Sequence, residues 1–126
     1  MKKIILTLGL VLLSLVASAQ NITFSENIPE EAAEVLSTRL QAMLKTAGLA
    51  ADTPLVVDAT VTDRVETSGS IAQLALSIDL VLTSGEVSRT FPLKGVGEDE
   101  TDAWIRASKQ FLPRSQATKE FTDKLR

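Results

Sequence analysis

The chain has 126 residues, 13 of them basic and 16 acidic, and it contains no histidine, cysteine or tyrosine. These absences exclude Ser-His-Asp and Cys-His catalysis, and they remove disulfides and the commonest zinc ligands. The acidic balance, with scattered lysines and arginines, argues against binding to nucleic acid or to an anionic membrane surface.

The first nineteen residues predict a signal peptide. Lys2 and Lys3 precede an apolar stretch over residues 4–16, and Ala17-Ser18-Ala19 is a small-x-small cleavage site. The stretch is shorter than the roughly 20 residues that a membrane span needs. No cysteine stands at the cleavage site to carry a lipid. We therefore expect an exported protein, periplasmic or extracellular, that begins near Gln20 and is soluble after cleavage.

Residues 20–126 predict a single domain with the order β-α-β-β-β-α-α. Without the two leader lysines it has 11 basic and 16 acidic residues, a net charge of −5. A short strand over residues 21–25 precedes a helix over residues 29–47, which opens with Pro29 and ends before Gly48. Leu36, Leu40 and Met43 recur on one face of that helix.

Three strands are predicted next. Residues 55–62 alternate between apolar and polar side chains, and residues 68–70 form a turn. Residues 74–82 follow with a strong period of two, and Ser84-Gly85 predicts a hairpin into a third strand through residue 93. Pro92 predicts that this strand lies at an edge of the sheet or has a bulge there. The expected fold is an α+β two-layer sandwich, with an antiparallel sheet and helices on one face.

The segment Lys94-Gly95-Val96-Gly97 is expected to break the sheet before two last helices. Asp99 is the predicted cap of the first helix, and its inward stripe runs from Ala103 to Leu112 before Pro113. Ser115 is the predicted cap of the last helix, which carries Phe121 and Leu125 four residues apart.

Several residues are candidates for functional sites. Glu98, Asp99, Glu100 and Asp102 are a candidate hard-cation cluster, but we favour a helix N-terminus complemented by negative charge. Gly95 and Gly97 are favoured as conformational glycines over a phosphate-binding loop.

Two further candidates have structural interpretations. Trp104 is favoured as a core residue over a ligand-stacking residue. Asp58, Asp63, Arg64 and Asp79 are expected to share the open face of the sheet as surface ion pairs. We assign no catalytic, cofactor-binding or metal-binding residue and no cofactor.

The order of "LVVDATVTD", "LALSIDLVLTSGEV" and "FPLKGVGEDETDAWIRASKQF" after an export leader resembles small envelope domains of the TolB amino-terminal and CsgG-like kind. That resemblance implies a three-stranded sheet packed on two helices, in non-catalytic proteins that bind partners or assemble. No functional residue is carried over from it.

The leading hypothesis is a non-catalytic binding or assembly module of the bacterial envelope whose partner is another envelope protein. That partner would dock at a sheet edge or on the polar sheet face. The alternative is a carboxylate-dependent hydrolase of cell-wall glycan, which requires two acids facing each other across a cleft. A cystatin-like inhibitor ranks last, because the Gln-x-Val-x-Gly loop is absent.

Overall fold

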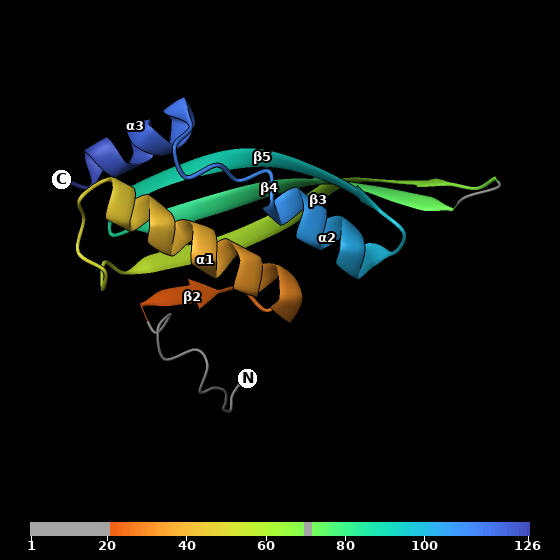
Figure 1. Cartoon of the computed structure of the whole chain (residues 1–126), viewed down its shortest axis with the longest axis horizontal. Coiled ribbons are helices and arrows are strands. Elements are labelled where there is room, and N and C mark those ends of the chain that lie inside the picture. Colours follow the sequence, from red (N-terminus) through yellow and green to blue (C-terminus); the bar gives the residue numbers. More distant parts are fainter. Residues whose placement is uncertain (1–20, 70–71) are drawn as a thin grey trace.

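A computed structural model describes residues 21–69 and 72–126 (Figure 1). The predicted leader, its cleavage site and Ser70 of the predicted turn lie outside the described residues. The elements in chain order are β2 (Ile22–Phe24), α1 (Glu30–Thr46), β3 (Leu55–Thr67), β4 (Gln73–Ser84), β5 (Val87–Gly97), α2 (Glu100–Ser108) and α3 (Gln116–Lys124).

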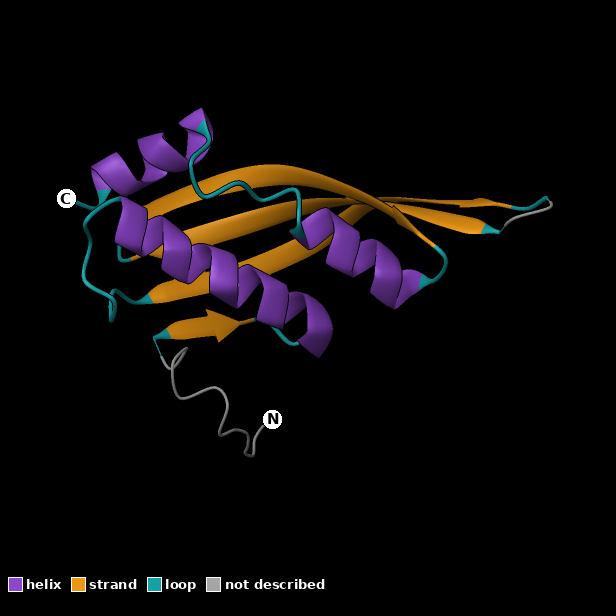
Figure 2. Ribbon diagram, in the orientation of Figure 1, coloured by secondary structure: helices purple, strands orange, loops and turns teal. Residues whose placement is uncertain are grey.

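The four strands form one sheet in the order β2-β3-β4-β5, and the helices lie largely on one side of it (Figure 2). The predicted α+β class and element order are confirmed. The sheet is mixed, because β2 pairs with β3 in parallel while the two later pairs are antiparallel. Helix α1 accounts for the parallel pair, since it returns the chain to the start of the sheet before β3 begins.

The core lies between the helices and one face of the sheet. The period of two in β4 is confirmed, because Leu74, Leu76, Ile78, Leu80 and Leu82 are all buried. Opposite them, α1 buries a stripe at helical spacing that consists of Ala32, Leu36, Leu40, Met43 and Leu44. The buried side chains of α1 and β4 therefore pack together in one apolar layer.

The expected break at Lys94 is wrong, since β5 continues through Gly97. Gly95 and Gly97 stand opposite the buried Leu76 and Leu74, on the face that α2 covers. A Cβ added at Gly95 would collide with the backbone of Ala103 and Ala107. These glycines allow α2 to pack tightly on the strand, and they do not turn the chain out of the sheet.

Helix α2 is shorter than predicted. It ends at Ser108, and tight turns follow in which Gln110 N–H donates to the Ala107 carbonyl and Phe111 N–H donates to the Ser108 carbonyl. Pro113 disfavours helical backbone at the residue before it. As a result Phe111 is buried, whereas Leu112 is 56% exposed instead of facing inward.

The predicted caps are confirmed. The Asp99 side chain accepts the backbone N–H of Asp102 at 2.8 Å, and the Ser115 hydroxyl accepts that of Thr118 at 3.2 Å. The hairpin prediction also holds, because Ser84 pairs with Val87 across a two-residue turn in which Gly85 has a φ of 61°.

Candidate functional site

The sheet face away from the helices, called the open face here, is polar with apolar patches. The register places Asp58, Val81 and Thr90 in one row across β3, β4 and β5. Further along the strands, Val65, Ala75 and Val96 form an apolar row. Val65 is 50% exposed and Val96 is 42% exposed. In Figures 1 and 2 no helix covers this face.

A bulge in β3 corrects one expectation about this face. The register shifts between Val61 and Asp63, so that Asp63 lies opposite Ser77 and Arg64 lies opposite the buried Leu76. Side chains directly opposite each other share a face of the sheet. Asp58, Asp63 and Asp79 therefore lie on the open face as expected, but Arg64 lies on the helix face.

Arg64 makes its ion pairs on the helix face. Its guanidinium donates to the Glu100 carboxylate at 2.8 Å and lies 3.8 Å from the Glu66 carboxylate. On the open face, Asp58 and Asp63 each accept the backbone N–H of the next residue. The expected grouping of all four charged residues is thus divided between the two faces by the bulge.

Strand β3 extends well beyond the helix-covered body. The sequence predicted a strand ending near residue 62, but β3 and β4 remain paired to Thr67 and Gln73. All residues of β3 from 60 to 67 are exposed. Figure 1 shows this hairpin projecting past α2 as an arm.

One edge of the arm has no strand beside it among the residues that the structure describes. Strand β2 pairs with β3 only over Leu55–Val57, after which Asn27 donates its side-chain amide to the Ala59 carbonyl. We call the same edge of residues 61–67 the free edge of β3. A strand edge with open N–H and C=O groups is a template for another chain.

The other long edge of the sheet has features that oppose strand addition. Pro92 lies in edge strand β5, as predicted, and has no N–H to donate. Lys94 lies two residues further along the same strand. Proline and lysine oppose edge-to-edge pairing, and residues 61–67 of β3 contain neither, although the bulge between Val61 and Asp63 and three charged side chains lie in this stretch.

The acidic cluster before α2 has structural roles. Asp99 caps the helix, Glu100 pairs with Arg64, and the Asp102 carboxylate accepts the backbone N–H of Glu98 at 3.1 Å. That backbone hydrogen bond, helped by Arg106 and Lys109, lowers the pKa of Asp102 below its ordinary value of 3.8. Within residues 21–69 and 72–126, no group of three or more acidic side chains is arranged to hold a metal ion.

A hollow of about 630 Å³ lies between the arm and the start of α2. It is lined in part by Arg64, Glu66, Glu98, Asp99 and Glu100. A glycosidase acid needs a carboxyl group kept protonated by an apolar pocket. Here the Glu66 side chain is 75% exposed, and the Glu100 side chain is 59% exposed and paired with arginine. The hollow therefore lacks the environment that the hydrolase hypothesis requires.

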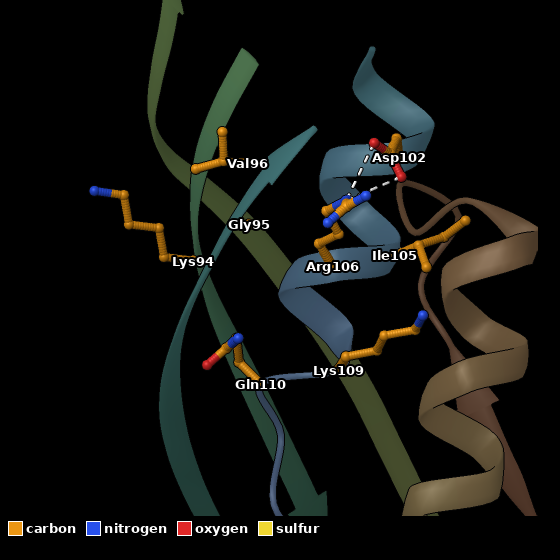
Figure 3. Close-up of a pocket in the computed structure, with 8 residues that line it drawn as sticks. All are labelled: Lys94, Gly95, Val96, Asp102, Ile105, Arg106, Lys109 and Gln110. Atoms are coloured by element: carbon orange, nitrogen blue, oxygen red, sulfur yellow. Dashed lines mark hydrogen bonds and ion pairs between the residues drawn. The ribbon is translucent and has the colours of Figure 1, made fainter. Parts of the chain in front are cut away.

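A second hollow, of about 570 Å³, lies beside α2 and β5 and includes Lys94, Arg106 and Lys109. Figure 3 shows that these cations do not converge. Lys94 points away from α2, Lys109 points along the opposite side of the helix, and Arg106 is engaged by Asp102. An anion would meet one free cation at a time, so this hollow is a poor anion site.

Trp104 is 3% exposed and belongs to the hydrophobic core, as predicted. It has no surface on which a ligand could stack. The described helices also include none long and apolar enough to cross a membrane.

Comparison with known proteins leaves the family open. No protein-family model matches the chain, and no curated protein sequence matches it. Among solved structures, the chain is similar to a minor lipoprotein from Acinetobacter baumannii, with 14% identity over 82% of this chain and 85% of that chain, at a TM-score of 0.34. An overlap this low carries no inference about function, and the resemblance to TolB and CsgG-like domains stays a prediction.

The sequence analysis did not predict the length of the arm. A signal was present, because two β-branched residues, Val65 and Thr67, follow Thr62 and are spaced two residues apart. The charged residues 63, 64 and 66 interrupt the apolar alternation from which the strand is predicted.

Proposed function

We propose that this chain is an exported, non-catalytic binding or assembly module of the bacterial cell envelope. Its leader is cleaved after Ala19, and the exported chain forms one domain. The observation that carries the proposal is the β3 arm, which extends past the core with a free edge and an uncovered open face. Burial of a core does not require this extension, since its outer strand stays exposed.

The mode of binding that fits the arm is strand addition. An extended segment laid along residues 61–67 would satisfy those backbone groups of the free edge that lack a partner, whereas the Arg64 N–H already donates to the Asp63 carboxylate. Val65 would contribute an apolar side chain on the open face, beside Ala75 and Val96. Strand addition requires a polypeptide, so the proposed partner is a protein, and a net charge of −5 after leader cleavage opposes binding to phosphate backbones.

Photo-crosslinking in the native cells tests this proposal. The full chain is made with a photoreactive residue at position 65, and a matched control chain carries it at Glu34, an exposed position on α1. We expect a defined adduct from position 65 and none from position 34, with the chain found in the envelope fraction at the mass expected for cleavage after Ala19. Absence of any adduct at position 65, or a full-length cytosolic chain, would contradict the proposal.

A further inference from the structure

The charged residues of the arm are complementary to those of a second copy of the arm placed antiparallel to it. Read forward, residues 63–67 are Asp-Arg-Val-Glu-Thr, and Arg64 and Glu66 stand symmetrically about Val65. Two copies of this segment placed antiparallel, with the two Val65 residues opposite each other, set Arg64 opposite Glu66 twice. Asp63 then lies opposite Thr67, so no like charges meet.

We propose that two copies of this chain pair through the free edges of β3, about a two-fold axis at Val65. This inference deepens the proposed function, on which it rests, by naming a second copy as the occupant of the edge. The sheets of the two copies become one continuous sheet, in which the two β3 strands pair antiparallel across the axis. Charge complementarity identifies the second copy as the partner, since Arg64 of each arm lies opposite Glu66 of the other.

The placement of side chains on the two faces agrees with this pairing. Arg64 and Glu66 lie opposite the buried Leu76 and Leu74, so both are on the helix face, where each meets its counterpart. Val65 lies opposite Ala75 on the open face, where the two Val65 side chains contact each other. Opposite charges and β-branched pairs placed directly across antiparallel strands both stabilise the pairing.

The shape of the molecule also allows the pairing. The arm projects beyond α2 (Figure 1), and in an antiparallel arrangement the helix-covered bodies lie at opposite ends of the joined arms. Five paired residues make a small contact at the low end of specific interfaces, so the dimer is weak. The pairing is therefore looked for in a concentration series that reaches about 1 mM.

Sedimentation of the protein purified after export, from about 10 µM to 1 mM, tests the proposal with a charge-swap series. The wild type is expected to pass from monomer to dimer across that range. Arg64→Glu and Glu66→Arg each place like charges opposite each other, and each is expected to weaken the dimer about tenfold or more. The double variant R64E/E66R restores opposite charges and the dimer, and an equimolar mixture of the two single variants forms the mixed dimer.

Glu100→Gln is the matched control. It removes the ion pair between Arg64 and Glu100 of the same chain but leaves residues 63–67, including the Arg64–Glu66 ion pair, unchanged. The control is expected to dimerise as the wild type does, which separates loss of edge pairing from loss of the intrachain ion pair. Raised salt should weaken the wild-type dimer and should strengthen association in each single variant.

A wild type that stays monomeric up to about 1 mM overturns the self-pairing, as does a dimer that both single charge reversals leave unchanged. If the crosslink from position 65 in cells then joins a different envelope protein, the proposed function stands and only the identity of the partner is wrong. If no crosslink forms at all, the proposed function itself fails.

Discussion

Gly95 and Gly97 illustrate how single residues set the distance between two elements. Both lie in β5 beneath α2. Neither has a positive φ, in contrast to Gly48 and Gly85. Glycine is required at both positions because the backbone of α2 occupies the space that a Cβ would need. The buried Ala103 and Ala107 on the facing side of the helix serve the same close approach.

Gly95→Ala should therefore destabilise the fold. The Cβ must displace the backbone of α2 at Ala103 and Ala107, and overpacking of this kind costs about 1–3 kcal/mol. Urea unfolding measures the loss. Gly69→Ala is the control, since Gly69 faces open space, and it should change stability by less than about 0.5 kcal/mol. Equal effects at the two positions would show that contact with α2 is not the reason for Gly95.

At the scale of elements, α2 is joined to the end of β5 by reciprocal hydrogen bonds. Asp99 accepts the Asp102 N–H, while the Asp102 side chain accepts the Glu98 N–H. Asp102 also meets Arg106 one turn further along the helix. This arrangement satisfies donors at the helix start, and it explains why acidic residues gather there without forming a metal site.

The lowered pKa of Asp102 makes this junction sensitive to acid. A carboxyl group whose pKa is lower in the folded than in the unfolded chain stabilises the fold fully above its unfolded value of about 3.8, and loses that effect as the pH falls through the lower folded pKa. Asp102→Asn should lower the free energy of unfolding at pH 7, and the gap to wild type should narrow below about pH 4. Urea unfolding across pH 7 to 2.5 measures both, and a gap independent of pH would contradict this account.

At the scale of the whole molecule, the sheet has two regions with different roles. The region between β2 and the bulge is covered by helices and supplies the core, whereas the outer strand of the arm is exposed on both faces. The arm remains attached because β4 runs through both regions, pairs with β5 along its length and keeps its leucines buried on the helix face. Stability and binding are therefore located in different parts of one sheet.

Leu80→Ala and Val65→Thr should separate these regions. Leu80 is buried in the middle of β4, and its truncation should lower the free energy of unfolding by about 2–5 kcal/mol. Val65 lies on the exposed arm, so Val65→Thr should change it by less than about 0.5 kcal/mol. Thermal or urea unfolding of dilute protein measures both. A large loss from Val65→Thr would show that the arm belongs to the core.

The sequence by itself determined the class of fold, the order of elements, the helix caps and the inward leucines of β4. Each of these depends on local periodicity or on the chemistry of one residue, which a linear sequence displays. Only the tertiary structure decided that β2 pairs in parallel, that β5 continues through Gly97 beneath α2, and that the bulge turns Arg64 to the helix face. Those outcomes depend on contacts between segments far apart in the chain, and a one-residue shift in register reverses the face of every side chain after it. The free edge of β3 belongs to the second group, because an edge is defined by the strand that is not beside it.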